Sequence, residues 1–331
     1  MCTPCLQTIL PSGNGCSRMP KFVSDEDFER AYEENPSPVA MSRRLGLHVR
    51  SVQNRLRRNG VLGMSGTQST MILKTIARFK AIGRIETEVK NGKIVIFSDA
   101  HYWPGFVSTA HRALLKVIKE EKPSVIVCNG DAFDGAQISR FGRQMWGKAP
   151  TVIDELKAVK ERLGEIEALA RGAKLFWPLG NHDARFETML SNKVGEFEGV
   201  EGFHLKDHFP FWNPCWSLFV NDDVVIKHRI KGGIHATRNN TLNAGRTTVT
   251  GHLHQLKITP FSDYNGVRYG IDTGTLADPY GPQFAYCEDS PVDWRSGFVV
   301  LSFRDGKLLY PQIAQVRAEG EVEYKGDIIE C

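Results

Sequence analysis

The sequence predicts an α/β layered sandwich preceded by a small all-helical domain. Between residues 94 and 178, short apolar runs alternate with long helical segments, which is the pattern of a sheet covered by helices. From residue 217 onward, strand-like runs follow one another and predict a β-rich second half. The chain has 331 residues, 41% of them hydrophobic and 24% charged, as in ordinary globular proteins. No apolar run reaches the ~20 residues that a membrane span needs, so an integral membrane protein is excluded.

Three short helices are expected near the N-terminus. Ser24 is a good N-cap for the first helix, whose opening acids complement the helix dipole, and Asn35-Pro36-Ser37-Pro38 breaks it. The second helix is expected over Val39–Leu45, ending at Gly46, and the third over Val49–Asn59.

The segment Pro38–Arg58 resembles a helix-turn-helix, in which Gly46 fits the sharp turn and Ser42 lies where two helices approach. The expected buried positions are Met41, Leu45, Leu47, Val52 and Leu56. Between residues 42 and 60 the chain has six arginines and no acid, which favours a polyanion such as DNA. The expected DNA contacts are Arg43, Arg44, Arg50, Gln53, Asn54, Arg57 and Arg58. A helical bundle used for protein contacts is the alternative.

Residues 62–70 are rich in Gly, Ser and Thr and predict a linker, and a short helix is expected at Met71–Lys80. Arg84–Lys90 and Lys93–Ser98 are predicted to pair as a hairpin, because Asn91-Gly92 favours a type I′ turn. Helices are then expected at Ser108–Glu120 and Val152–Ala170. The expected strands are Ile94–Ser98, Val125–Cys128, Lys174–Pro178, Ser217–Val220, Val224–Lys227, Thr247–Thr250, Lys257–Phe261, Val267–Ile271, Gly297–Phe303 and Lys307–Gln312.

The expected domain organisation follows from these elements. It comprises a disordered N-terminus at 1–20, a helix-turn-helix domain at 21–62, a linker and hairpin at 63–92, a main α/β domain at 93–316 and a solvated tail at 317–331.

Side chains of the types that bind metals follow five of the expected strands, and Asp134 among them is expected to orient its loop rather than to bind metal. These residues are Asp99 and His101; Asp131 and Asp134; Asn181, His182 and Asp183; His228; and His252 and His254. Active sites in open α/β sheets lie at the carboxyl ends of strands, so these residues are predicted to share one site. Histidine nitrogens mixed with Asp and Asn oxygens suit manganese, iron, zinc or nickel. Two such ions, about 3.5–4 Å apart, would hold a phosphate and lower the pKa of a bound water.

The ordered set Asp-x-His, Gly-Asp-x-x-Asp, Gly-Asn-His-Asp, His and Gly-His-x-His resembles the calcineurin-like metallophosphoesterase family over about Lys93 to Phe303. The resemblance implies a four-layer α/β/β/α sandwich and a dinuclear metal site, with manganese the favoured ion. It implies a first metal held by Asp99, His101, Asp131 and His254, and a second held by Asp131, Asn181, His228 and His252. His182 would protonate the leaving group or hold the phosphate, and Asp183 would orient His182.

One ligand position has two candidates. His228 ends a strand-like run, as the motif requires, whereas His235 follows Gly232-Gly233-Ile234. Arg229 follows His228 where the family often has a glycine, which leaves His235 as a competitor. We favour His228 because of its strand context.

Other side chains near the motifs have two interpretations each. Tyr102 and Trp103 follow His101 and could stack on a base, although aromatic residues more often pack in a core. Arg140 and Arg143 follow the Gly-Asp-x-x-Asp motif and could hold a phosphodiester backbone or form surface ion pairs.

We expect a metal-dependent hydrolase of phosphoester bonds, acting on DNA because of the arginine-rich helices. This combination resembles phage-type nucleases. A phosphomonoesterase or protein phosphatase of the same family is the alternative, and a DNA-binding regulator with an inactive phosphatase domain is an alternative of another class. Seven scattered cysteines and an N-terminus unlike a secretory signal predict a reducing cytoplasm, that of the host if the protein is phage-encoded. No membrane partner is expected, and the sequence leaves the oligomeric state open.

Overall fold

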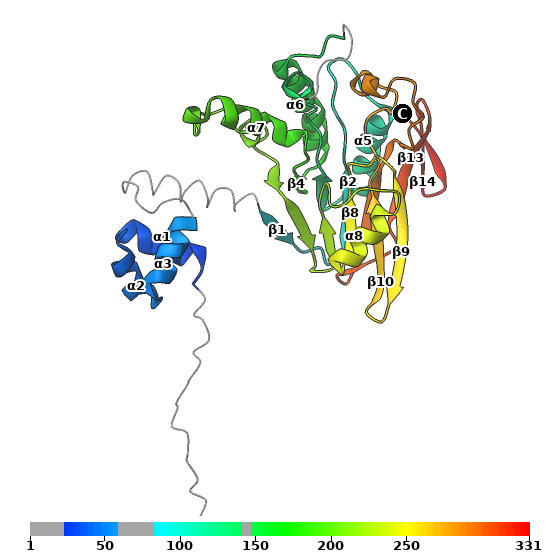
Figure 1. Cartoon of the computed structure of the whole chain (residues 1–331). Coiled ribbons are helices and arrows are strands. Elements are labelled where there is room, and N and C mark those ends of the chain that lie inside the picture. Colours follow the sequence, from blue (N-terminus) through cyan, green and yellow to red (C-terminus); the bar gives the residue numbers. More distant parts are fainter. Residues whose placement is uncertain (1–22, 59–82, 141–146) are drawn as a thin grey trace, which may run out of the picture. The chain divides into compact units, whose positions relative to one another are not determined.

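The computed structural model describes residues 23–58, 83–140 and 147–331. The chain divides into two compact units, Met1–Lys80 and Ala81–Cys331. Figure 1 shows helices alone in the described part of the first unit, and both sheets and helices in the second. The expected N-terminus at 1–20, the helix at Met71–Lys80 and nearly all of the linker lie outside the described residues.

The N-terminal unit contains three short helices, α1 (Asp25–Glu34), α2 (Pro38–Leu45) and α3 (Val49–Arg58). Ser24 caps α1, because its hydroxyl oxygen accepts a hydrogen bond from the Asp27 amide at 3.1 Å. Gly46 ends α2 in the left-handed conformation with a φ of 63°, which permits the sharp turn into α3.

The core of this unit is formed by one face of each helix. Met41, Leu45, Val52 and Leu56 are buried and Leu47 is partly buried, as predicted. Phe28, Ala31 and Tyr32 of α1 complete the cluster. The hydroxyl of Ser42 donates to the Leu47 carbonyl at 2.6 Å, which ties the end of α2 to the turn.

The larger unit is built on two sheets. The nine-stranded sheet has the order β15-β14-β13-β11-β2-β3-β4-β5, with β12 paired to β11, and the six-stranded sheet has the order β1-β6-β7-β8-β10-β9. The strands of the first sheet are β2 (Gly92–Phe97), β3 (Val125–Cys128), β4 (Lys174–Pro178), β5 (Asn213–Cys215), β11 (Gly297–Arg304), β12 (Lys307–Leu308), β13 (Gln312–Ala318), β14 (Glu321–Tyr324) and β15 (Asp327–Glu330). Those of the second are β1 (Arg84–Thr87), β6 (Ser217–Val220), β7 (Val224–Ile226), β8 (Thr247–Thr250), β9 (Lys257–Asp263) and β10 (Gly266–Asp272).

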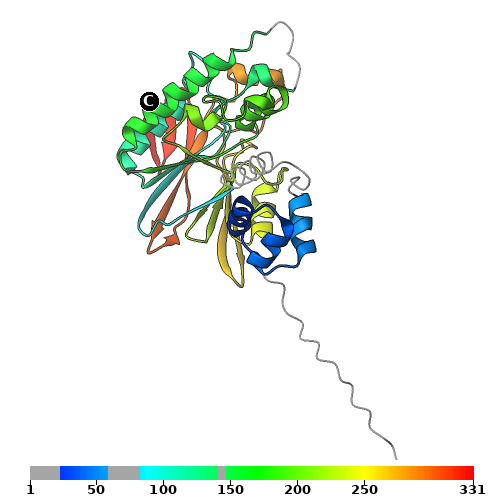
Figure 2. The ribbon, with the colours of Figure 1, turned by 90° about the vertical axis from the view of Figure 1, so that its left-hand side faces the viewer.

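Helices cover the outer faces of both sheets. α5 (Thr109–Glu121) and α6 (Val152–Leu169) pack on the nine-stranded sheet, and α8 (Ala236–Ala244) packs on β8, β9 and β10. In Figure 2, α6 (green) lies along one face of the larger sheet. α7 (Asp183–Lys193) follows β4. The two sheets and their helices form the expected four-layer α/β/β/α sandwich.

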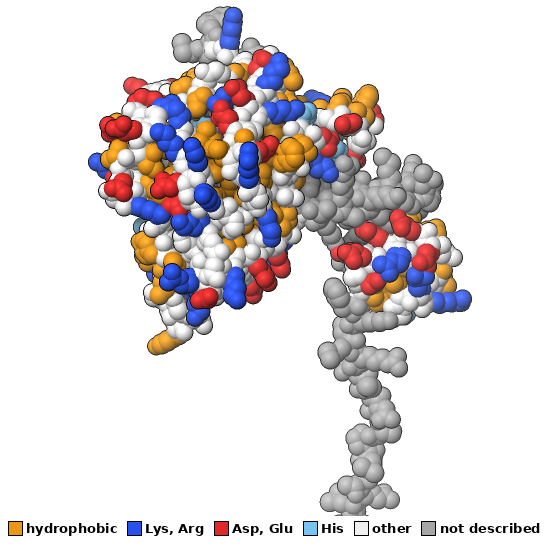
Figure 3. Space-filling model, turned by 180° about the vertical axis from the view of Figure 1, so that it is seen from behind, with side chains coloured by type: hydrophobic (Ala, Val, Ile, Leu, Met, Phe, Trp, Pro, Cys, Tyr) orange, Lys and Arg blue, Asp and Glu red, His pale blue; other side chains and the backbone are white. Residues whose placement is uncertain are grey.

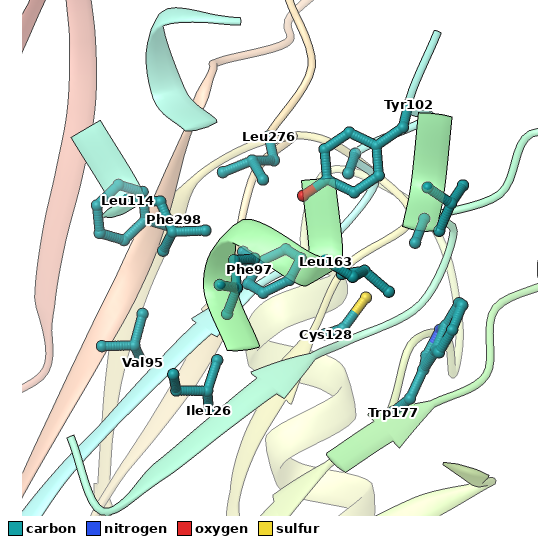
Figure 4. Close-up of a cluster of buried hydrophobic side chains, with 14 of the residues drawn as sticks. Val95, Phe97, Tyr102, Leu114, Ile126, Cys128, Leu163, Trp177, Leu276 and Phe298 are labelled. Carbon is teal, nitrogen blue, oxygen red and sulfur yellow. The ribbon is translucent and has the colours of Figure 1, made fainter. Parts of the chain in front are cut away.

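The central strands are buried on both faces because they lie between two layers. Successive side chains along a strand point to opposite faces, so Val95 and Phe97 pack under the helices whereas Ile94 and Ile96 face the second sheet. Figure 4 shows the first of these clusters. The apolar runs of the sequence therefore correspond to strands held rigidly from both sides.

The hairpin predicted around Asn91-Gly92 is wrong. β1 pairs in parallel with β6, whereas β2 pairs with β3 and β11, so the two strands lie in different sheets. Neither Asn91 nor Gly92 has the positive φ that a type I′ turn requires. A side chain at Gly92 would approach the Ser124 hydroxyl at 2.9 Å, so the glycine serves close packing at the start of β2.

The tail expected at 317–331 is also corrected, because the sheet continues to residue 330. β13, β14 and β15 form an antiparallel meander beyond β11. Val322 and Tyr324 are buried between exposed glutamates, so this segment carries the alternation of a half-buried strand. The strand predicted over Lys307–Gln312 is divided into β12 and β13, and β5, α7 and α8 were not predicted.

No helix in the described part of the chain has the length and apolar character needed to cross a membrane.

Candidate active site

The predicted ligand residues emerge where parallel strands of the two sheets end. β2, β3 and β4 run parallel in one sheet, and β7 and β8 run parallel in the other. Asp99 follows β2 and His254 follows β8, yet His254 Nε2 lies 3.0 Å from Asp99 Oδ1. The carboxyl ends of both sheets therefore meet at one place, as the strand-end pattern predicted.

These loops are held in an unusual backbone conformation. Five predicted ligands, Asp99, His101, Asp131, His252 and His254, have φ values between 38° and 72°. Positive φ is uncommon for residues other than glycine and costs free energy, and such strain clusters at functional sites. The surrounding fold stabilises these loops and directs their side chains inward.

Two clusters of the predicted ligands could each hold a metal ion. Asp99, His101 and His254 form one cluster. Asp131, His228 and His252 form the other, and within each cluster the ligand atoms lie within 4.8 Å of one another. His228 Nε2 lies 3.0 Å from Asp131 Oδ2. Each cluster contains three of the four ligands expected for one ion, and a third cluster joins His101, Asp134 and His182.

The amide of Asn181 supports metal binding independently. Its Oδ1 atom is buried and has no hydrogen-bond partner among the described residues. An unpaired buried oxygen is costly, and a divalent cation would satisfy it. The donor set of carboxylate and amide oxygens with imidazole nitrogens therefore fits two divalent ions.

The structure brings His228, and not His235, to the site. His228 is buried, and its Nδ1 lies 2.7 Å from the Asn129 carbonyl, an arrangement that directs Nε2 toward Asp131. His235 is exposed at the start of α8 and belongs to neither cluster.

The role expected for Asp183 is corrected by the structure. Its Oδ2 accepts hydrogen bonds from the amides of Asp131 (2.8 Å) and Gly180 (2.9 Å) and from the Trp177 indole (3.0 Å). Its Oδ1 accepts from the Ala132 and Phe133 amides at 3.1 Å each. Asp183 therefore holds the loop that carries Asp131, because its position at the start of α7 places the carboxylate under that loop.

The carboxylate that meets the His182 ring belongs to Asp134. His182 Nδ1 lies 3.0 Å from Asp134 Oδ1 and 2.9 Å from the Asp134 carbonyl. Arg185 donates to the same carbonyl at 2.9 Å and lies 3.2 Å from His182 Nε2. Asp134 also contacts His101 Nδ1 at 2.8 Å, so it orients a predicted ligand as well as His182.

The charges at the site shift several pKa values. Burial lowers the pKa of His182, but its hydrogen bond to Asp134 and the charge of Asp131 outweigh burial, so the net shift is upward. Burial raises the pKa of Asp99, yet the neighbouring His254 and His228 lower it to about 2. The Asp99 carboxylate therefore remains ionised at neutral pH and is ready to bind a cation.

Two aromatic rings border the site. Phe284, in the short helix η4 (Pro282–Cys287), has its ring centroid 5.2 Å from that of His101. Trp294 lies 4.6 Å from His254 between ring centroids. Trp294 ends the loop-rich segment 287–294, which the sequence predicts to cap the cleft, whereas Phe284 follows no strand that would mark it. Arg185 was missed for the same reason, because it lies within α7.

Stacking on a base by Tyr102 is not supported. Tyr102 is only 5% exposed, and its hydroxyl lies 3.1 Å from His111 Nδ1. Figure 4 shows its ring within the core beneath the helices. Arg140 is exposed and Arg143 lies outside the described residues.

The residues expected to contact DNA differ in their surroundings. Arg43, Arg50 and Asn54 are exposed, Gln53 is partly buried, and Arg44 forms an ion pair with Glu34. The side chains of Arg57 and Arg58 lie outside the described residues. In Figure 3, acidic and basic side chains both lie on the visible face of the helical unit.

Comparisons with known proteins agree with the site. The family model of the calcineurin-like phosphoesterases matches residues 92–270, which is more than half of the chain. A comparison with curated proteins finds no match.

Several solved structures are similar to this chain at low TM-scores. Vps29 with zinc from Entamoeba histolytica is 13% identical, with a TM-score of 0.38 over 72% of this chain and 98% of that one. The phosphoesterase YfcE from E. coli is 19% identical, with a TM-score of 0.31 over 66% and 97%. A dimetal phosphatase from Danio rerio is 10% identical, with a TM-score of 0.37 over 71% and 99%.

The family match covers all seven predicted ligands, from Asp99 to His254. The chain therefore belongs to the calcineurin-like phosphoesterase family and is a hydrolase that acts on ester bonds.

Proposed function

We propose that this hydrolase is a phosphodiesterase that cleaves DNA with two bound divalent ions, for which manganese is the favoured metal. The observation that carries the proposal is the convergence of two clusters of three predicted ligands each, with His182 Nε2 4.0 Å from Asp131 Oδ2. When bound, two such ions would lower the pKa of a water molecule and neutralise the charge of the phosphate.

The chain's own residues have distinct parts in this reaction. Asp99, His101 and His254 would hold one ion, and Asp131, Asn181, His228 and His252 the other, while the family resemblance implies that Asp131 would also serve the first ion. His182 would give a proton to the leaving oxygen, since its ring is held by Asp134 and its pKa is raised.

The N-terminal helices support DNA as the substrate. Arg43 of α2 and Arg50 and Asn54 of α3 are exposed, and we propose that this pair of helices is a DNA-binding helix-turn-helix. Phosphate contacts by arginine position a protein on DNA, whereas Asn and Gln can read base edges.

The experiment that tests this proposal is manganese-dependent cleavage of end-labelled single- and double-stranded DNA. His252→Ala is the inactive variant, and His235→Ala is its matched control, because His235 is an exposed histidine outside both clusters. We expect cleavage by the wild type and by His235→Ala, and none by His252→Ala. Hydrolysis of bis-p-nitrophenyl phosphate without any cleavage of DNA would overturn DNA as the substrate and leave a phosphoesterase with another one.

We also propose that the protein works in a reducing cytoplasm. Cys128, Cys215, Cys287 and Cys331 are free thiols in the described part of the chain. Free, partly buried cysteines are typical of proteins kept reduced.

A further inference from the structure

A basic pocket opens beside the second ligand cluster. It has a volume of about 250 Å³ and is lined by residues of two segments and one helix. These residues are Arg229, Ile230, Lys231, Gly232, Asn240, Thr250, Gly251, His252 and Leu253. The lining thus contains the predicted ligand His252, two cations and no acid.

Arg229 and Lys231 are free to bind an anion. Both side chains are exposed, and neither has an ion pair or hydrogen bond to another side chain within residues 23–58, 83–140 and 147–331. Arg246 and Arg268, which also belong to this half of the molecule, are each paired with an aspartate. The two cations therefore leave a net positive potential in the pocket, and guanidinium and ammonium groups together favour phosphate.

The loop that carries the two cations is held in place. Asn240 of α8 is only 2% exposed and contacts the backbone of Lys231 twice. Its Oδ1 accepts from the Lys231 amide at 3.2 Å, and its Nδ2 donates to the Lys231 carbonyl at 3.0 Å. The loop position is therefore set before a ligand arrives, which reduces the entropy lost on binding.

The position of the pocket defines what it can bind. Arg229 directly follows His228, and His252 belongs both to the pocket lining and to the cluster with His228. An anion in the pocket would thus lie next to a phosphate held at the predicted metal site. The pocket therefore suits a neighbouring phosphate of the same substrate.

We propose that this pocket binds the phosphate group adjacent to the one that is hydrolysed, so that the preferred substrate carries two or more linked phosphates. This inference rests on the proposed phosphodiesterase activity. Linked phosphates occur in a nucleic-acid strand and in a polyphosphate. The same loop exposes Ile230 (40%) and Ile234 (75%), which could contact a nucleoside and so favour the strand.

The test compares p-nitrophenyl esters that share one scissile bond. The first is the ester of thymidine 5′-phosphate, which has no neighbouring phosphate. The second is the ester of the 5′-phosphate of a thymidine trinucleotide, and the third is the γ-ester of thymidine triphosphate. For the double variant Arg229→Gln/Lys231→Gln, we expect kcat/KM on the trinucleotide ester to fall about 10- to 100-fold, as for the loss of charged hydrogen bonds. On the ester of thymidine 5′-phosphate, the kcat/KM of the double variant should stay within about twofold of the wild-type value.

A binding measurement supplies a second readout that does not depend on turnover. Calorimetric titration of the metal-loaded protein with 5′-phosphorylated thymidine dinucleotide should show a similar loss of affinity in the double variant. Titration with thymidine 5′-monophosphate should show no loss of affinity in the double variant. Arg304→Gln is the matched control, since Arg304 is an exposed arginine at the end of β11 and does not line the pocket.

The possible outcomes separate this inference from the proposed function. An equal loss on all three esters, or no loss on any, would overturn the pocket assignment while leaving the phosphodiesterase intact. A selective loss on the triphosphate ester alone would assign the pocket to polyphosphate and refute the strand. If the wild type hydrolyses no ester, the proposed function fails, and the calorimetric titration still decides whether the pocket binds a second phosphate.

Discussion

Asp183 offers a direct test of how the site is held together. Its carboxylate accepts five hydrogen bonds, from the amides of residues 131, 132, 133 and 180 and from the Trp177 indole. Asp183→Asn keeps the shape of the side chain but replaces one accepting oxygen with a donating NH₂ group. If the amide oxygen takes the place of Oδ2, the Ala132 and Phe133 amides lose their acceptor.

The expected effect is large because these donors are buried. Each buried amide left without an acceptor costs about 1–3 kcal/mol, so the free energy of unfolding should fall by about 2–6 kcal/mol. That is a substantial part of the about 5–15 kcal/mol that stabilises a typical domain. Urea unfolding of the metal-free protein measures the change. The exposed Asp223→Asn variant is the control and should unfold like the wild type.

Two other outcomes would contradict this role of Asp183. If Asp183→Asn unfolds at the same urea concentration as the wild type, the carboxylate does not hold the Asp131 loop. A loss of activity with a shifted pH profile and unchanged stability would instead mean that Asp183 acts through His182.

Three further predictions follow from the same structure. His182→Ala should lower kcat about 10²–10⁴-fold without loss of bound metal, because His182 belongs to neither predicted ligand set; loss of metal on elemental analysis would contradict this. Burial and the charge of Asp134 raise the pKa of Glu155 to about 7 from an ordinary 4.5. The folded state therefore favours the protonated form of Glu155. The stability that this protonated form contributes is fully present below about pH 4.5 and is lost as the pH rises through about 7. In the metal-free protein, the stability difference between wild type and Glu155→Gln should change over this range, and a constant difference would refute the shift. Arg43→Ala and Arg50→Ala should each weaken binding to duplex DNA and reduce the slope of its salt dependence by about one. Hydrolysis of bis-p-nitrophenyl phosphate should be unchanged. Unaltered DNA affinity would exclude these phosphate contacts.

Much of the site could be predicted from the sequence because its signals are local. A buried strand is marked by a short apolar run, and a ligand that directly follows such a run must lie at the sheet edge. Asp99, Asp131 and His252 each come within three residues of a strand end, and the structure places all three at the site. The choice of His228 over His235 depended on this same rule.

The errors arise where local preference and tertiary contacts disagree. Asn91-Gly92 has the composition of a tight hairpin turn. In the structure, Gly92 is instead needed for packing, because the Ser124 hydroxyl lies where a side chain would be. The glutamates of β14 suggested a solvated tail, although the alternate residues Val322 and Tyr324 enter the core.

The sequence by itself therefore determined the fold class, the order of the strands that end in ligands and the chemistry of those ligands. These properties depend on the periodicity of apolar residues and on the residue type after each strand. Tertiary structure alone decided which groups contact each other across the two sheets. It paired Asp183 with the Asp131 loop, Asp134 with His182, and Arg229 with the pocket beside His252. Such contacts join residues far apart in the chain, and their distances are set by how the layers pack.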